Sequence, residues 1–150
     1  MVDQVTVHAT CVAVDGKGVL LRGPSGAGKS DLALRLIETG SLLVSDDQVV
    51  LNRKNQQIIA SPPPALAGLL EVRGVGICSY DFATVCDLAI IIDLEGGVVP
   101  ERMPEIGAQQ QTLLGVDITC LKLDPFQASA SAKVRAALRL IAAKHLLASS

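Results

Sequence analysis

Aromatic residues are almost absent from this sequence: its 150 residues include no tryptophan, one tyrosine and two phenylalanines. Proteins that bind single-stranded nucleic acids stack bases on aromatic side chains and neutralise the backbone with clustered Lys and Arg. This chain carries a formal net charge of −2 and has no basic block. The composition therefore argues against nucleic acid as a partner.

Long apolar runs and metal-type cysteine pairs are missing as well. Hydrophobic residues make up 49% of the chain, yet no run approaches the roughly 18 residues that cross a bilayer. The first four residues lack the basic and apolar regions of a signal peptide. The four cysteines form no C-x-x-C pair and are interpreted as small buried hydrophobes in a reducing compartment. We therefore expect a cytoplasmic protein with no membrane association.

The length and the apolar pattern predict one α/β domain with a mixed sheet, spanning residues 1–150. Runs rich in β-branched and aliphatic residues predict strands at 5–14, 19–21, 42–44, 49–51, 58–59, 88–93 and 118–123. Amphipathic patterns predict helices at 30–39 and 128–147, a short helix at 65–70, and a loop at 96–111.

One motif has a specific chemical meaning. The segment GPSGAGKS matches the phosphate-loop pattern G-x-x-x-x-G-K-[ST], and it lies between a predicted strand and a predicted helix. Its glycines let successive backbone N–H groups point at an anion, and the helix dipole adds positive potential. The predicted nucleotide-binding residues are Gly23, Pro24, Ser25, Gly26, Ala27, Gly28, Lys29 and Ser30. Lys29 would reach the β- and γ-phosphates of ATP, and the Ser30 hydroxyl would ligate Mg²⁺.

Two places could supply the carboxylate that accompanies such a loop. Asp93 ends the apolar run LAIII, as the metal-binding acid of an ordinary phosphate-loop enzyme does. Asp46 and Asp47 end the strand at 42–44, which would run parallel to the strand before the loop. Adjacent residues at a strand end point to opposite sides, so only one of these two acids need face the nucleotide. From the residues alone, both places stay open.

The phosphate loop, the Asp46–Asp47 pair and the segment LEVRGVGI at 70–77 together resemble the catalytic domain of HPr kinase/phosphorylase. That enzyme phosphorylates a serine of HPr, the phosphocarrier protein of the phosphotransferase system. LEVRGVGI is similar to the signature of the family and is more specific than the phosphate loop. The resemblance covers roughly residues 5–125. It implies a phosphate-loop-containing mixed sheet of the HPr kinase/phosphoenolpyruvate carboxykinase type.

The resemblance also implies roles for individual residues. Asp47, with Asp46 beside it, resembles the acceptor of the serine proton, and Glu71 resembles a second magnesium ligand. His8 falls where the family has an active-site histidine. Arg73 and Arg102 would be active-site arginines, which could neutralise charge on the phosphoryl group. The implied cofactors are ATP and Mg²⁺, the implied partner is an HPr-like phosphocarrier protein, and the implied assembly is a homo-oligomer, a hexamer in the family.

Three features depart from the family pattern. The chain resembles the short form found in alphaproteobacteria, which lacks the N-terminal domain. Ala9 follows the histidine where the family has glycine, and residues 122–127 do not reproduce the Pro-Val-x-x-Gly-Arg-Asn segment that is associated with phosphate removal. Phosphorylase activity therefore stays open. Two other functions also remain: a phosphate-loop kinase of small molecules, and a nucleotide-binding regulator that hydrolyses ATP slowly and uses Asp93.

Overall fold

The structure is a computed structural model that describes residues 3–99 and 101–149, with side chains described up to residue 144. Its strands are β1 (Gln4–His8), β2 (Thr10–Val14), β3 (Lys17–Arg22), β4 (Leu42–Ser45), β5 (Gln48–Lys54), β6 (Gln57–Ser61), β7 (Leu69–Val72), β8 (Gly76–Ser79), β9 (Cys86–Leu94), β10 (Gln110–Leu113) and β11 (Val116–Leu123). Its helices are α1 (Lys29–Glu38), α2 (Ala130–Ser149) and the 3₁₀ turn η1 (Pro64–Leu66).

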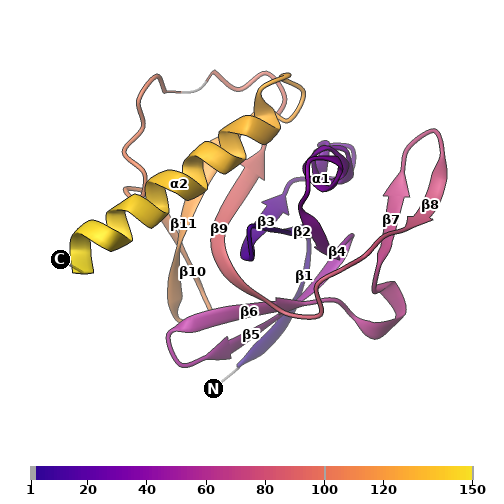
Figure 1. Ribbon diagram of the computed structural model, residues 1–150, viewed down its shortest axis with the longest axis horizontal. Coiled ribbons are helices and arrows are strands. Elements are labelled where there is room, and N and C mark those ends of the chain that lie inside the picture. Colours follow the sequence, from indigo (N-terminus) through magenta and orange to yellow (C-terminus); the bar gives the residue numbers. More distant parts are fainter. Residues whose placement is uncertain (1–2, 100, 150) are drawn as a thin grey trace.

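A single curled sheet organises the molecule (Figure 1). Its strand order is β1-β5-β6-β9-β3-β2-β4, with β11 also pairing with β9 and β10 pairing with β11. The first residues of β9 pair with β6, whereas the rest of β9 lies parallel to both β3 and β11. Since β9 belongs to both halves of the sheet, this one strand joins them.

The pairing brings several strand ends to one edge. β3, β9 and β11 run in the same direction because both outer strands are parallel to β9. β4 also runs parallel to β3, because both strands are antiparallel to the intervening β2. The segments that follow β3, β4, β9 and β11 therefore leave the sheet at the same edge, where ligands bind in open α/β sheets.

Apolar residues form a core on each face of the sheet. Ile90 and Ile92 of β9 face one core, and Ile91 between them faces the other. Leu88 also faces the second core, because the register between β9 and β3 shifts after Gly18 and breaks the alternation there. Leu32 and Leu36 of α1 and Val134 of α2 pack into the core that contains Ile90. Both helices thus cover one face, while β1, β5 and β6 enclose the second core (Figure 1). Each fully buried leucine contributes about 2 kcal/mol through burial.

Most predicted elements are present, and three differ. The strand expected at 5–14 is two strands, because the chain stops pairing with β5 at His8 and pairs with β3 and β4 after Ala9. The helix expected at 65–70 is only η1, since Gly68 adopts a φ of +76° and Leu69 begins β7. The loop expected at 96–111 ends in β10, which starts at Gln110.

The strands predicted at 49–51 and 58–59 are confirmed as β5 and β6, which pair antiparallel as a hairpin. The segment LEVRGVGI forms a second hairpin, β7–β8, which projects from the body of the molecule beside α1 (Figure 1). Neither helix of the described residues has the length and apolarity needed to span a membrane.

Candidate active site

A cleft of about 500 Å³ lies at the sheet edge where the strands end. Its lining comes from five places: the turn between β1 and β2, the loop at 23–30 with the start of α1, the residues after β4, the β7–β8 hairpin, and the segment after β11. The lining residues include His8, Lys29, Ser30, Asp46, Asp47, Glu71 and Arg73. These seven predicted site residues, and with them Ser25, Gly26 and Gly28 of the predicted loop, therefore meet in one cavity although they come from four separate segments.

The predicted phosphate loop connects β3 to α1. Gly26 and Gly28 have φ values of +83° and +97°, a conformation that residues with a Cβ rarely adopt. Gly28 is the N-cap of α1, so the unpaired N–H groups of the first helical turn face the cleft. A Cβ on Gly28 would also lie only 3.0 Å from Pro125 Cγ. Glycine is therefore required here both for backbone shape and for space.

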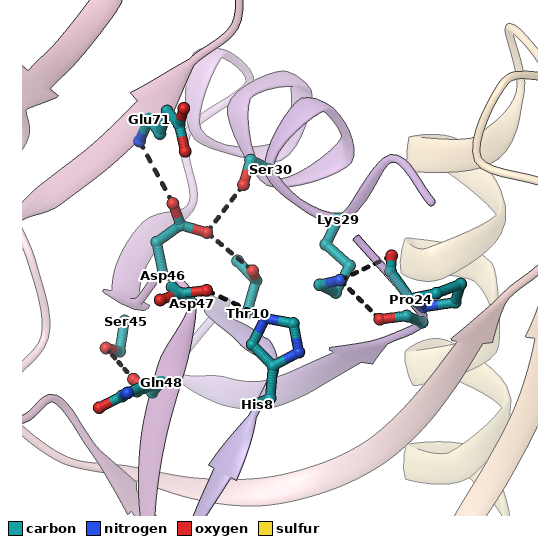
Figure 2. A network of polar contacts seen from close by, with 11 residues as sticks. His8, Thr10, Pro24, Lys29, Ser30, Ser45, Asp46, Asp47, Gln48 and Glu71 are labelled. Carbon is teal, nitrogen blue, oxygen red and sulfur yellow. Dashed lines mark hydrogen bonds and ion pairs between the residues drawn. The ribbon is translucent and has the colours of Figure 1, made fainter. Parts of the chain in front are cut away.

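Lys29 is nearly buried at the base of the loop. Its Nζ donates to the carbonyl oxygens of Gly23 at 2.6 Å and Pro24 at 3.0 Å (Figure 2). An ammonium group has three N–H donors, so one donor remains for a ligand in the cleft. The backbone of the loop thus holds the lysine head in place beside the space that a phosphate would occupy.

Asp46 is the centre of the polar network in Figure 2. Its Oδ1 accepts hydrogen bonds from Thr10 Oγ1 and Ser30 Oγ, each at 2.8 Å, and its Oδ2 accepts one from the backbone N–H of Glu71 at 3.2 Å. Only 7% of the residue is exposed. Three donors from β2, α1 and β7 therefore fix both oxygens of a buried carboxylate.

Asp47 has a different environment. Its Oδ1 lies 3.0 Å from His8 Nε2, and the two side chains are 65% and 53% exposed. Because a carboxylate only accepts, the imidazole donates its Nε2–H in this bond. The backbone of Asp47 has a φ of +70°, which breaks the strand geometry directly after β4 and turns its carboxylate into the cleft beside Asp46. Both acids therefore line the cleft, where a regular strand would have turned one away.

Glu71 and Arg73 reach the cleft from the projecting hairpin. Glu71 is exposed on β7, and Arg73 lies in the turn that follows this strand. Both residues line the cleft. The hairpin therefore adds one acid and one base to a cavity whose floor is formed by Lys29, Ser30 and Asp46.

The oxygen groups around Ser30 fit a magnesium ion. Adjacent ligands of an octahedral Mg²⁺ with bonds of about 2.0–2.1 Å lie about 2.9 Å apart, and Ser30 Oγ and Asp46 Oδ1 are separated by 2.8 Å. Hydroxyl and carboxylate oxygens are also the ligands that this ion prefers. Among the described residues no group of three or more His, Cys, Asp or Glu side chains is arranged to hold a metal. The donors therefore suit an ion that shares its shell with phosphate and water.

Asp93 and Arg102, two other candidates, lie outside the described lining of the cleft. Asp93 accepts from Arg22 Nε at 2.8 Å and Arg22 Nη2 at 3.0 Å, and Cys120 Sγ lies 3.3 Å from its Oδ2. Partial burial raises the pKa of Asp93, but the bonds from Arg22 and Cys120 lower it by more. The net pKa of Asp93 is therefore below its usual range. Arg102 is exposed in the segment between β9 and β10.

The sequence analysis missed two lining residues with clear positions. Thr10 donates a hydrogen bond to Asp46. It follows His8 by two positions, and residues at that spacing in a strand lie on the same face, so the prediction for His8 could have been extended to Thr10. Phe126 lines the cleft at the end near Gly28. No motif marks it, and the sequence analysis used the scarcity of aromatic residues only to argue against nucleic acid as a partner.

Comparison with known proteins agrees with this geometry. Residues 1–147 match the family model described as HPr Serine kinase C-terminal domain. An HPr kinase/phosphorylase from Lacticaseibacillus casei (strain BL23) is 33% identical over 131 residues, which are 82% of this chain and 41% of that protein. An HPr kinase/phosphorylase from Clostridium tetani is 40% identical over 99 residues, 61% of this chain and 32% of that protein.

A solved structure is also similar. The Hpr(Ser) kinase/phosphatase from Coxiella burnetii matches with a TM-score of 0.80 at 26% identity, over 94% of this chain and 98% of that one. This likeness confirms the predicted fold class. The chain spans about two fifths, 41%, of the length of the Lacticaseibacillus relative.

Proposed function

This chain belongs to the HPr serine kinase C-terminal domain family, and from that premise we propose that it is a Mg²⁺–ATP-dependent serine kinase of an HPr-like phosphocarrier protein. The observation that carries the proposal is the meeting of Lys29, Ser30, Asp46 and the His8–Asp47 pair in one cleft. A phosphate-binding loop alone would fit many functions. Asp47 lies outside the buried hydrogen-bond network of Asp46, and it therefore provides a separate carboxylate that can accept the proton of a substrate hydroxyl.

The two acids divide the work. Asp46 is buried and its oxygens are occupied by Thr10, Ser30 and Glu71, so it serves to hold the metal side of the cleft. Asp47 is exposed to the cavity and is bound only through Oδ1 to His8, which leaves Oδ2 available. The carboxylate that can take a proton from an incoming hydroxyl is therefore Asp47.

In the proposed transfer, the serine oxygen of the carrier attacks the γ-phosphorus of ATP while Asp47 accepts the hydroxyl proton. The bond between the γ-phosphorus and the bridging oxygen breaks, and ADP leaves. His8 holds the Asp47 carboxylate in position through its Nε2–H. Lys29 and the N–H groups of the loop bind the phosphates, and Arg73 offsets charge on the transferred group.

Magnesium, held by Ser30, Asp46 and Glu71, would neutralise charge on the β- and γ-phosphates. In the reverse of this step ADP would accept the phosphoryl group from the phosphoserine, and a protonated Asp47 would donate its proton to the released serine oxygen. Residues 122–127 differ from the segment that the family resemblance associates with removal of the phosphate, so the proposed function is the forward reaction.

The decisive experiment combines the protein with purified HPr, ATP and Mg²⁺ and measures the intact mass of HPr. We expect HPr to gain one phosphoryl group that survives acid, as phosphoserine does, and to gain none when the serine is replaced by alanine. Unchanged HPr despite ATP turnover would contradict the proposal and favour a small-molecule kinase. ATP turnover that requires Asp93 but not Asp47 would favour a nucleotide-binding regulator.

A further inference from the structure

We propose that Phe126 is the surface on which the nucleobase of the bound nucleotide stacks. The inference depends on the proposed function only in that the ligand of the loop at 23–30 is a nucleotide. It assigns a binding surface to a residue in the segment that differs from the family pattern.

The topology places Phe126 next to the phosphate loop. β11 is parallel to β9, and β9 is parallel to β3, so the segment after β11 leaves the sheet beside the segment after β3. The ring of Phe126 also lies close to the phosphate loop. A Cβ atom added to Gly28 would be 3.4 Å from Phe126 Cε1. A Cβ on Gly96 would lie 3.2 Å from Phe126 Cε2. One edge of the ring is therefore packed between two glycines.

The rest of the ring is open. Phe126 is 64% exposed and lines the same cleft as Lys29 and Ser30. The chain has two other aromatic residues, Tyr80 and Phe82, both in the described residues, and neither is among those that line this cleft. An exposed aromatic ring in the same cavity as a phosphate loop matches the two chemically different parts of a nucleotide, its base and its phosphates.

The backbone around the ring is fixed without any ligand. Asp124 accepts hydrogen bonds from the N–H of Phe126 through Oδ1 at 2.9 Å and from the N–H of Gly97 through Oδ2 at 3.1 Å. Arg35 of α1 donates to the carbonyl oxygens of Gln127, at 3.1 Å, and of Pro125. These bonds join the segment to α1 and to the end of β9. The ring is therefore presented on a rigid support, and its removal leaves the support intact.

Stacking has a predictable selectivity. Every base has a π-face, so a ring that offers only stacking binds different bases with similar strength. Phe126 has no hydrogen-bonding group on its side chain, so the ring itself reads no base edge. We therefore expect the cleft to bind ADP and GDP with similar affinity.

The first test compares ligands with and without a base. Binding of Mg²⁺–ADP and of Mg²⁺–pyrophosphate would be measured by calorimetry on the wild-type protein, Phe126→Ala and Phe126→Tyr. Loss of base stacking should weaken ADP binding on the order of tenfold in Phe126→Ala, while pyrophosphate binding stays unchanged. Phe126→Tyr should bind ADP as the wild type does, because it keeps the ring.

The second test uses the absence of tryptophan from the chain. Phe126→Trp introduces a single fluorophore at the proposed surface, and Phe82→Trp places one outside the described lining of the cleft as a matched control. ADP should change the fluorescence of Phe126→Trp, pyrophosphate should change it much less, and neither ligand should affect Phe82→Trp.

Two results would overturn the inference. Equal weakening of ADP and pyrophosphate in Phe126→Ala would show that the ring only supports the loop, and unchanged ADP binding would show that the base lies elsewhere. The proposed kinase function fails on a different readout, the mass of HPr incubated with the wild-type protein. The ratio of the two affinities can be measured whether or not HPr is phosphorylated, so the two failures are distinguishable.

Discussion

The Ser30 hydroxyl donates to Asp46 Oδ1 over 2.8 Å and so joins the first turn of α1 to the residue directly after β4. This bond connects the phosphate loop to the buried acid that the sequence could not distinguish from its neighbour. Thr10 on β2 also donates a hydrogen bond to Asp46 Oδ1. Variants of Ser30 and of Asp46 should therefore have related effects on the proposed binding of Mg²⁺.

Replacing Asp46 with asparagine should weaken the binding of Mg²⁺ and so raise the Mg²⁺ concentration that phosphorylation requires. The change keeps the size of the side chain but removes a charged oxygen ligand, and we expect Mg²⁺ to bind roughly 10- to 100-fold more weakly. The measurement is the Mg²⁺ concentration that gives half-maximal phosphorylation of HPr. Thr10→Val is the control, because it removes one donor to Asp46 and keeps the carboxylate. An Asp46→Asn protein with normal magnesium dependence would contradict the assignment.

Replacing Asp47 with asparagine should remove the proton acceptor. Asparagine tolerates the positive φ at this position, so the backbone should be retained. We expect kcat to fall about 10²- to 10⁴-fold with little change in the affinity for Mg²⁺–ADP. His8→Ala should lower kcat less, since it only positions Asp47. If Asp93→Asn abolishes turnover and Asp47→Asn does not, the proposed division of roles is wrong.

The pair of Arg22 and Asp93 should make stability depend on acidic pH. The net pKa of Asp93 is lower in the folded protein than its ordinary value of about 3.9. Because the pKa of Asp93 is lower in the folded than in the unfolded protein, its ionised carboxylate stabilises the fold at pH values above the unfolded-state pKa. This stabilisation is lost as the pH falls through the folded-state pKa. Asp93→Asn should therefore be less stable than the wild type at neutral pH. Urea denaturation midpoints at neutral pH and near about pH 3 should show the difference shrinking in acid, and a constant difference would refute this explanation.

Arg135 of α2 should stabilise the end of α1. Its Nη2 donates to the carbonyl oxygen of Thr39 at 3.2 Å and also contacts Leu36 O and Thr39 Oγ1. Leu36 O also accepts the N–H groups of Thr39 and Ser41, whereas Thr39 is the C-cap, whose carbonyl can no longer bond within the helix. Arg135→Ala should lower the free energy of unfolding by about 1–2 kcal/mol, as measured by urea denaturation. Arg139→Ala on the same helix is the matched control, and activity at low temperature should be unchanged in both.

Much of the fold was predictable because its signals are local. The phosphate loop has a motif, α1 has a periodic apolar face, and β9 is an uninterrupted aliphatic run. The hairpin of β5 and β6 was visible from the polar turn between two apolar segments. Each of these elements is determined mainly by residues within about ten positions of one another, so the sequence alone is enough to place them.

The division of roles between the acids was not predictable. Strand geometry alone would turn Asp46 and Asp47 to opposite sides, and only the left-handed backbone at Asp47 brings both into the cleft. The donors that distinguish them, Thr10 and the N–H of Glu71, come from positions 36 and 25 residues away in the chain. Such contacts leave no local pattern. Phe126 was overlooked for the same reason, since its importance comes from its distant neighbours Gly28 and Gly96.

The break between β1 and β2 has a consequence for how this site can change. His8, Ala9 and Thr10 are consecutive, and they bind Asp47 Oδ1, the Asp47 carbonyl and Asp46 Oδ1 respectively. One tripeptide therefore holds both Asp47 and Asp46 in place. An insertion or deletion there would displace both acids at once, so this tripeptide should tolerate substitutions far better than any change in its length.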